Sequence, residues 1–269
     1  MKLQNDHIGD SLTRNKTNEL GKIRDLMLKG TLISTLKSRA EADIARVTGP
    51  YVPATTSVGA AGQGNYWESY SLKLGRSVRT HSDLMHDYIV LLESDCNVAT
   101  YCEYPIAAGK SVRRRRVRFR VDSWVRQVDG TEHFCILEKK RTGYDGQDIS
   151  LPRVPNDLTE WAALNGASIK IVLEREIRKE PYRLSNLKLI LHFLRVHSKT
   201  NISGFEIEEL WKGKPSITFS EAFKILGGNR PTEQTRAYLL TLIVRGGLSA
   251  DLSLGPLTDA TVLRRGTAI

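Results

Sequence analysis

Cysteine is scarce in this sequence, and its few copies have no spacing that suggests a bridge or a metal site. The three cysteines, Cys96, Cys102 and Cys135, are odd in number and lie in no Cys-x-x-Cys pair. A disulfide framework and a structural zinc site both depend on such pairs. The composition therefore argues against a small disulfide-stapled scaffold and against a zinc finger.

Long apolar runs and nucleotide-binding loops are missing as well. The polar N-terminus lacks the apolar core of a signal peptide, and no window reaches the ~20 apolar residues that cross a bilayer. No glycine-rich loop ends in Lys-Ser or Lys-Thr, which argues against a P-loop ATPase. No glycine pattern of a nucleophile elbow supports a Ser-His-Asp hydrolase. We expect an intracellular, cytoplasmic protein that makes no membrane contact.

Acidic residues are in deficit. The chain has 40 Lys and Arg against 30 Asp and Glu, a formal net charge of +10, which favours a polyanionic partner. The excess is concentrated just before Asp122, in a run that consists of Lys110, Arg113, Arg114, Arg115, Arg116, Arg118 and Arg120. We expect the six arginines to contact DNA phosphates. The alternative for such a run is a solvated loop that binds nothing.

The strand pattern around this run predicts that two acidic side chains come together. Apolar and charged side chains alternate from residue 117 to 122, so one face of the strand expected at 117–125 carries Arg118, Arg120 and Asp122. The Asp-Gly pair at 129–130 predicts a hairpin turn, so that residues 133–140 form the returning strand. Glu138 and Lys140 share one side of that strand because side chains alternate. The hairpin is expected to bring the carboxylates of Asp122 and Glu138 close together.

Two converging carboxylates suit a hard cation. Mg²⁺ is bound by one or two carboxylates together with substrate phosphates, and Mn²⁺ is an alternative. We expect Asp122 and Glu138 to hold the metal, with the backbone carbonyl of Lys139 as a further ligand and Lys140 beside the bound phosphate. Such a site hydrolyses a phosphodiester by activating water and neutralising phosphoryl charge. The competing interpretation is a solvated strand edge with cross-strand charge pairs.

Several short motifs follow one another between residues 71 and 140. They are Ser71-x-Lys73-x-Gly75-Arg76, Ser82-Asp83-Leu84, Leu91-Leu92-Glu93 with Val98, Glu103-Tyr104-Pro105, Asp122, and Glu138-Lys139-Lys140. Together they resemble the TnsA family, the endonuclease subunit of heteromeric cut-and-paste transposases, which tends to have Glu-Gln-Pro at the fourth motif. The catalytic domain of that family is similar to restriction enzymes of the PD-(D/E)xK class.

The resemblance implies a function and a set of partners. It implies Mg²⁺-dependent nicking of the non-transferred DNA strand at transposon ends, in the cytoplasm of a bacterial cell. It also implies a separate DDE-type transposase subunit, and an AAA+ ATPase regulator that contacts the C-terminal half. A stand-alone restriction or repair nuclease is an alternative that the residues leave open.

One position departs from the family. The family has a catalytic Glu directly after Ser-Asp-Leu, and this chain has Met85 there. Asp87 lies two residues on, roughly 200° around a helix from position 85. Three interpretations follow: Asp122 and Glu138 hold the metal without a helix acid, Asp87 replaces it, or the chain has lost cleavage and serves as a DNA- and protein-binding assembly subunit. We favour the first.

The order of predicted elements indicates an α/β protein in three parts. Residues 1–64 form a helical extension and linker, 65–180 a restriction-endonuclease-like mixed sheet flanked by helices, and 181–269 a winged-helix-like domain. In the last part, Arg230, Arg236 and Arg245 would contact DNA phosphates from a helix at 232–245. That helix is also rich in leucine, so we favour protein docking over groove reading for this half.

Overall fold

The computed structural model describes most of the chain beyond residue 64. The described residues are Tyr51, Pro53 and residues 65–105, 121–139, 154–197, 208–228 and 231–266, with the backbone alone of 111–112 and 115–116. Residues Pro53–Ile269 form one compact unit, to which every element below belongs. The expected helical extension at 1–64 lies almost wholly outside the described residues, and the domain boundaries at 64 and 180 stay predictions.

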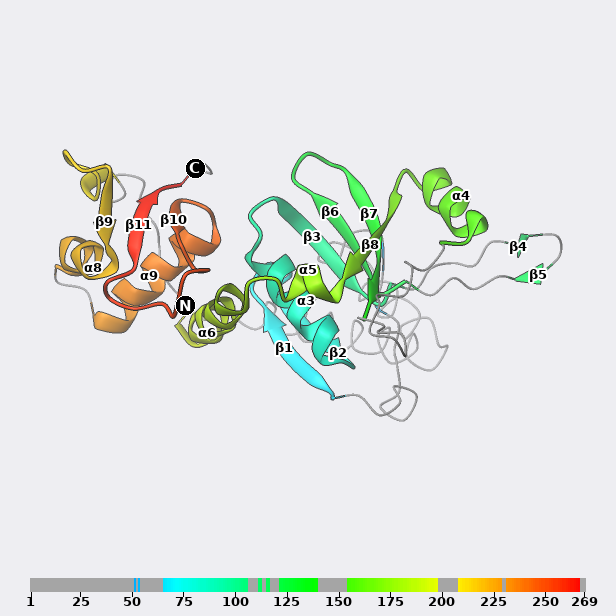
Figure 1. Cartoon of the computed structure of the whole chain (residues 1–269), viewed down its shortest axis with the longest axis horizontal. Helices are drawn as coiled ribbons and strands as arrows, with labels where there is room; N and C mark the ends of the chain where they lie inside the picture. The colour runs from blue at the N-terminus through cyan, green and yellow to red at the C-terminus, as the bar shows by residue number, and fades with distance from the viewer. Residues whose placement is uncertain are drawn as a thin grey trace, which may run out of the picture. The chain divides into compact units, whose positions relative to one another are not determined.

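A mixed four-stranded sheet occupies the first half of this unit (Figure 1). Its strands, in spatial order, are β3 (Val98–Glu103), β6 (Ser123–Gln127), β7 (Glu132–Glu138) and β8 (Ser168–Leu173). The first three are mutually antiparallel, and β8 runs parallel to β7. The expectation of a mixed α/β sheet is confirmed.

Helices α3 (Asp83–Ser94) and α4 (Asn156–Leu164) cover opposite faces of this sheet. The Phe134 ring lies 4.7 Å, centroid to centroid, from Trp161 of α4. The next residue, Cys135, accepts a hydrogen bond at Sγ from the Tyr88 hydroxyl of α3 at 3.3 Å. Since neighbouring residues of a strand point to opposite faces, the two helices must flank the sheet from both sides.

The hairpin between β6 and β7 forms where the Asp-Gly pair predicts it. Gly130 has a φ of +86°, a conformation that side chains with a Cβ seldom adopt. The Asp129 carboxylate accepts hydrogen bonds from the Thr131 amide at 2.9 Å and from its hydroxyl at 2.7 Å. Strand β6 begins at Ser123 rather than at 117, and residues 117–120 lie outside the described residues.

A buried carboxylate ties the hairpin of β1 (Trp67–Ser71) and β2 (Arg76–Thr80) to α3 and β3. Glu93 of α3 accepts hydrogen bonds from the Ser71 hydroxyl, the Tyr101 hydroxyl and the Lys73 amide, each at 2.7 Å. A carboxylate out of water is stable only with such a complete set of donors. This network therefore fixes where α3 lies against the sheet.

Two cationic side chains, Lys73 and Arg76, complete the junction. The Lys73 ammonium donates to the carbonyls of Leu92, Asp95 and Val98 at 2.9, 2.6 and 2.7 Å, which joins the end of α3 to the start of β3. The Arg76 guanidinium donates to both carboxylate oxygens of the buried Glu103 at 2.6 and 2.5 Å. The motif residues between 71 and 103 thus hold the scaffold together.

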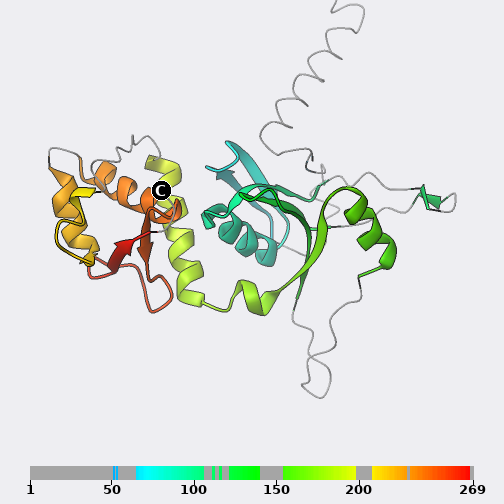
Figure 2. The ribbon, with the colours of Figure 1, turned by 90° about the horizontal axis from the view of Figure 1, so that it is seen from above.

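The second half contains α5 (Glu174–Ile177), α6 (Pro181–His197), β9 (Ser216–Thr218), α8 (Phe219–Gly227), α9 (Thr232–Val244), β10 (Leu248–Ala250) and β11 (Val262–Arg265). Helix α6 packs beside α9 (Figure 2). The three strands form an antiparallel sheet in the order β10-β11-β9, with β11 in the centre.

The short strands β4 (Ser111–Val112) and β5 (Arg115–Arg116) lie in the first half and pair with each other within the arginine-rich stretch.

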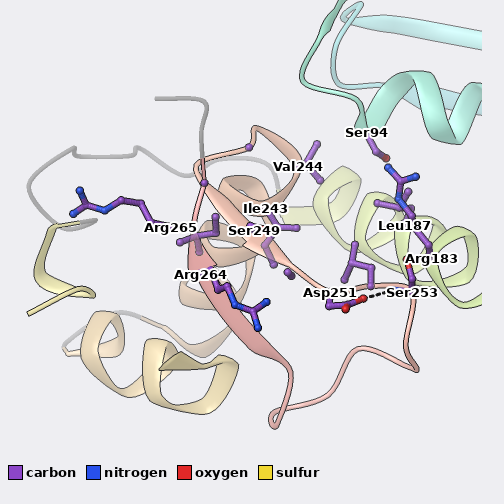
Figure 3. Close-up of a pocket in the computed structure, with 15 residues that line it drawn as sticks. Ser94, Arg183, Leu187, Ile243, Val244, Ser249, Asp251, Ser253, Arg264 and Arg265 are labelled. Atoms are coloured by element: carbon purple, nitrogen blue, oxygen red, sulfur yellow. Dashed lines mark hydrogen bonds between the residues drawn. The ribbon is translucent and has the colours of Figure 1, made fainter. Parts of the chain in front are cut away.

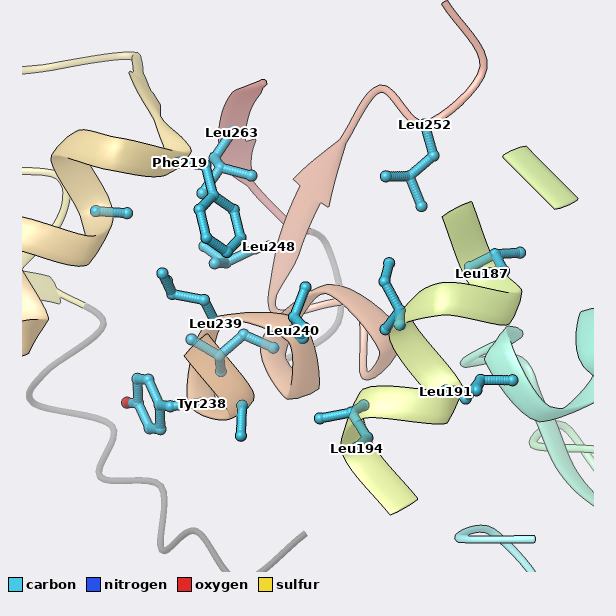
Figure 4. Packing of buried hydrophobic residues seen from close by; sticks show 14 of the residues in the cluster. Leu187, Leu191, Leu194, Phe219, Tyr238, Leu239, Leu240, Leu248, Leu252 and Leu263 are labelled. Carbon is cyan, nitrogen blue, oxygen red and sulfur yellow. The ribbon is translucent and has the colours of Figure 1, made fainter. Parts of the chain in front are cut away.

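Helix α9 lies at the centre of the core in this half (Figure 4). It buries Thr235, Ala237, Tyr238, Leu239, Leu240 and Leu242. The facing side chains come from α6, α8 and the three-stranded sheet, and include Leu187, Leu191, Phe219, Leu248 and Leu263. Burial of each large apolar side chain contributes about 1.5–3 kcal/mol. The leucine-rich face of α9 is therefore committed to packing inside the chain.

We expect Glu93→Gln to lower the free energy of unfolding by about 1.5–3 kcal/mol. The hydrogen bonds to a buried charge are lost, and the new side-chain NH₂ group faces groups that themselves donate hydrogen bonds. The matched control is Glu68→Gln, whose side chain is 40% exposed, and we expect it to change stability by less than about 0.5 kcal/mol. Urea unfolding of both variants measures the difference. Equal losses would contradict a structural role for Glu93.

Helix α8 gives a prediction about acid stability. The Thr218 amide donates to Glu221 at 2.8 Å while the Glu221 amide donates to the Thr218 hydroxyl at 3.1 Å. The Thr218 amide and, next, the Lys214 ammonium lower the pKa of Glu221 from its ordinary 4.5 to about 2. The stabilisation is thus present above pH 4.5 and is lost as the pH falls toward 2. Unfolding curves across this window should be less pH-dependent for Glu221→Gln than for the natural chain, and identical slopes would refute the cap.

Candidate functional site

Asp122 sits immediately before β6, between the ends of two neighbouring strands. Its carbonyl accepts a hydrogen bond from the Tyr104 amide at 2.8 Å, and its amide donates to the Cys135 carbonyl at 2.9 Å. One carboxylate oxygen accepts from the Leu137 amide of β7 at 2.7 Å. The half-buried Asp122 carboxylate is therefore held over β7, one residue before Glu138.

Glu138 is the last residue of β7 and is partly exposed. It lies opposite Leu173, the last residue of the parallel strand β8. Strand alternation places Glu138 on the same side as Phe134, the side that α4 covers, whereas α3 packs on the Cys135 side. The exposed Lys139 follows directly, and Lys140 lies outside the described residues. The roles of these residues in catalysis stay predictions.

The predicted DNA-binding arginines are only partly visible. Arg115 and Arg116 form β5, of which the backbone alone is described. Arg113, Arg114, Arg118 and Arg120 lie outside the described residues. The pairing of β4 with β5 shows that part of the stretch has strand structure, and contact with DNA stays a prediction.

Met85 lies in the first turn of α3, where the family has its catalytic Glu. The Ser82 hydroxyl caps this helix by accepting a hydrogen bond from the Met85 amide at 3.1 Å. The Met85 side chain is only 1% exposed and belongs to the core. A buried thioether supplies no oxygen to a hard cation. This helix position therefore adds no metal ligand.

Asp87 has a structural role. Its side chain is buried, one carboxylate oxygen accepts a hydrogen bond from Arg178 Nε at 2.8 Å, and the other pairs with Lys188 Nζ at 2.5 Å. Arg178, which directly follows α5, also pairs with Glu174 of that helix. Both oxygens of Asp87 are thus used to join α3 to α5 and α6. The interpretation in which Asp87 replaces the helix acid loses its support.

Tyr104 is a feature that the sequence reasoning missed. Its φ is +43°, and it is the one non-glycine residue in the described part of the chain with a positive φ. The residue before a proline normally adopts extended backbone, so this conformation is held by its surroundings, among them the Asp122 carbonyl and the His81 amide, which donates to the Tyr104 hydroxyl at 3.1 Å. Strained backbone clusters at functional sites. The sequence offered one sign of this feature, because Tyr104 stands where the family tends to have the Gln of Glu-Gln-Pro.

Asp122 and Glu138 are two of the oxygen ligands that a hard cation would need. Within the described ranges, no group of three or more His, Cys, Asp and Glu side chains is close enough to hold a metal ion. Asp122 and Glu138 provide carboxylate oxygens, and Mg²⁺ in phosphate-processing sites is commonly held by one or two carboxylates plus the substrate. Carboxylate oxygens of this kind suit Mg²⁺ or Mn²⁺ when a substrate phosphate completes the ligand set.

The C-terminal half has a cavity of about 530 Å³, lined by Arg183, Arg264 and Arg265 among others (Figure 3). The three arginines do not point toward one common centre. Arg265 pairs with Glu208 at 2.6 Å, and Arg183 lies 3.8 Å from Glu180. The cavity is therefore no preformed anion site.

The helix predicted to contact DNA is α9. Arg236 is exposed on this helix and Arg245 is exposed directly after its end, whereas Arg230 lies outside the described residues. Because its leucines fill the core, α9 presents few side chains for reading bases. Among the helices that the structure describes, none has the length and apolar character of a membrane span.

We expect Asp87→Asn to lower the free energy of unfolding by roughly 1–3 kcal/mol, because two cations lose their charged partner. The affinity for Mn²⁺, measured by isothermal titration calorimetry, should stay unchanged. The exposed Asp157→Asn in α4 serves as control and should change stability by less than about 0.5 kcal/mol. Loss of metal binding in Asp87→Asn at unchanged stability would reverse the assignment.

Comparison with known proteins adds no relative. No model of a known protein family matches the chain, and a search of curated proteins gives no significant match. The resemblance to the TnsA family therefore rests on the motif residues quoted above and stays a prediction.

Proposed function

We propose that this chain is a metal-dependent DNA endonuclease, similar to the TnsA subunit of heteromeric transposases. In this role it nicks the non-transferred strand at transposon ends, together with a DDE-type transposase, in the bacterial cytoplasm. The observation that carries the proposal is the Asp122 carboxylate held over β7, one residue before Glu138. The arginine-rich stretch leads directly into Asp122, which brings positive charge to the same place in the sequence.

Two features of the fold support the finer assignments. A mixed sheet with α3 and α4 on opposite faces agrees with a restriction-endonuclease-like domain. The succession α6, β9, α8, α9, β10, β11, with β11 between the other two strands, agrees with a winged-helix-like domain. Both assignments are proposals that follow from element order.

The residues would divide the chemistry as follows. Asp122, Glu138 and the Lys139 carbonyl would hold Mg²⁺ or Mn²⁺, and the bound ion would lower the pKa of a water and neutralise phosphoryl charge. Lys140 would orient the attacking water or offset the growing negative charge. The arginines at 113–120 would bind the flanking phosphates and so fix the position of the scissile bond.

A second candidate function has its own observation. Met85 is buried and Asp87 is engaged in ion pairs, so α3 brings no acid to the site. This arrangement favours an assembly subunit that binds DNA and proteins without cutting. Removal of Asp122 or Glu138 distinguishes the two functions, because an endonuclease would lose cleavage and an assembly subunit would not.

The C-terminal half supports protein docking in either case. Tyr182, Leu189 and Val196 lie seven residues apart on α6 and are all exposed. Positions spaced by seven fall on one face of a helix. Such an apolar stripe is suited to a protein partner, for which we propose the AAA+ ATPase regulator implied by the resemblance.

We expect Asp122→Ala and Glu138→Ala each to reduce cleavage by roughly 100-fold or more, because charge stabilisation at the phosphoryl group is lost. Nicking of plasmid DNA that carries transposon ends, with Mg²⁺ and the partner transposase present, measures this. The exposed Asp157→Ala is the control and should cut normally. Unchanged excision in folded Asp122→Ala and Glu138→Ala would favour the assembly subunit instead.

A further inference from the structure

Exposed aromatic side chains gather at the start of β1. Aromatic residues make up only 7% of the chain, yet Tyr66 and Trp67 are neighbours and are 43% and 40% exposed. Their rings contact His81 and His86, and His81 in turn contacts Tyr104. We call these five residues the aromatic ledge. Large exposed rings at one place commonly mark a binding surface.

Trp67 is held in one orientation although it faces solvent. Its ring stacks on His86 with centroids 4.5 Å apart and planes 13° from parallel. Its indole N–H donates to the Asp83 carboxylate at 2.8 Å, and Asn65 donates to the same carboxylate at 3.0 Å. Because His86 covers one ring face, the exposed area belongs to the other face and the edge. A ring fixed in advance loses little entropy when a ligand stacks on it.

Three rings of the ledge lead toward the candidate site. Tyr66 lies 5.6 Å from His81, and His81 lies 5.7 Å from Tyr104, centroid to centroid. The Tyr104 amide donates to the Asp122 carbonyl at 2.8 Å. The strained backbone of Tyr104 is therefore the link between the ledge and the strand that carries Asp122. The row of rings thus leads to the end of the sheet at which Asp122 lies.

The ring on which Trp67 stacks is uncharged at neutral pH. Burial lowers the pKa of His86, and the nearby Lys188 and Arg195 lower it further, although Asp87 and Asp83 act in the opposite direction. His86 therefore stacks as a neutral ring at neutral pH. Of the two cations that act on it, Lys188 pairs with Asp87 at 2.5 Å and Arg195 donates to the Tyr70 carbonyl at 2.7 Å. Fixed aromatic rings with an exposed face are typical of surfaces on which the bases of a single strand stack.

We propose that the aromatic ledge is a stacking platform for an unpaired base of the DNA strand that enters the Asp122–Glu138 end of the sheet. A base within a duplex has both faces covered by its neighbours, so only a splayed or single-stranded base offers a free face to Trp67. The platform would hold the strand next to the proposed cleavage site. The inference rests on the proposed function, in which DNA is the substrate, and adds that the DNA is unpaired where it contacts Trp67.

The test measures binding without cleavage. The full-length chain is titrated in EDTA with a fluorescent single-stranded oligodeoxynucleotide and with the matching duplex. We expect Trp67→Leu to weaken single-strand binding by roughly 5- to 100-fold and duplex binding much less. Trp67→Phe, which keeps a ring, should restore most of the affinity. In a strand with 5-iododeoxyuridine, irradiation should produce an adduct with Trp67 or Tyr66, mapped by mass spectrometry.

Tyr70→Ala is the matched control, because Tyr70 is 48% exposed on the same strand and is no member of the ledge. Circular dichroism confirms that each variant is folded. The proposal is overturned if folded Trp67→Leu binds like the natural chain, if Tyr70→Ala loses as much affinity, or if duplex binding falls equally. If the natural chain cleaves DNA and Trp67→Leu neither binds single strands more weakly nor cleaves less, the stacking platform is overturned and the nuclease stands. If single-strand binding depends on Trp67 but the natural chain does not cleave DNA, the nuclease is overturned and the stacking platform stands.

Discussion

Buried carboxylates with complete sets of donors are the constraint on which the first half of the structure depends. Glu93 fixes α3 to the β1–β2 hairpin and β3, Glu103 receives Arg76 of β2, and Asp87 receives Arg178 and Lys188. An uncompensated charge in the interior is so costly that each acid requires its partners nearby. The position of α3 follows from these pairs, and with it the place of the aromatic ledge.

The same constraint explains why α3 contributes nothing to a metal. Its acids are engaged in holding the scaffold, and Met85 fills the core at the position where the family has a Glu. Any metal chemistry then falls to the strands, where the Leu137 amide holds the Asp122 carboxylate over β7, one residue before Glu138. A site built in this way depends more on substrate phosphate than one with a third acid. Placement of the DNA strand would accordingly matter more, which gives the proposed stacking platform a physical purpose.

Tertiary packing also decides how the C-terminal half can act. Leu239, Leu240 and Leu242 of α9 fill a core shared with α6, α8 and the three-stranded sheet. A helix buried on most sides cannot enter a major groove along its length. Exposed apolar side chains instead line α6, which agrees with the expectation that this half docks on a protein surface rather than reads DNA bases.

Local signals in the sequence determined the elements that need no distant partner. The Asp-Gly pair predicts the β6–β7 turn because Gly130 alone accepts its backbone conformation, and alternation predicts the strands that hold Phe134 and Glu138. The tertiary structure alone decided which charges meet: Asp87 and Arg178 are 91 residues apart in sequence. It also decided that Tyr104 takes a positive φ before a proline, and that Trp67 stacks on His86. Turn and strand preferences are properties of a few consecutive residues, whereas ion pairs and ring contacts exist only after folding brings distant segments together.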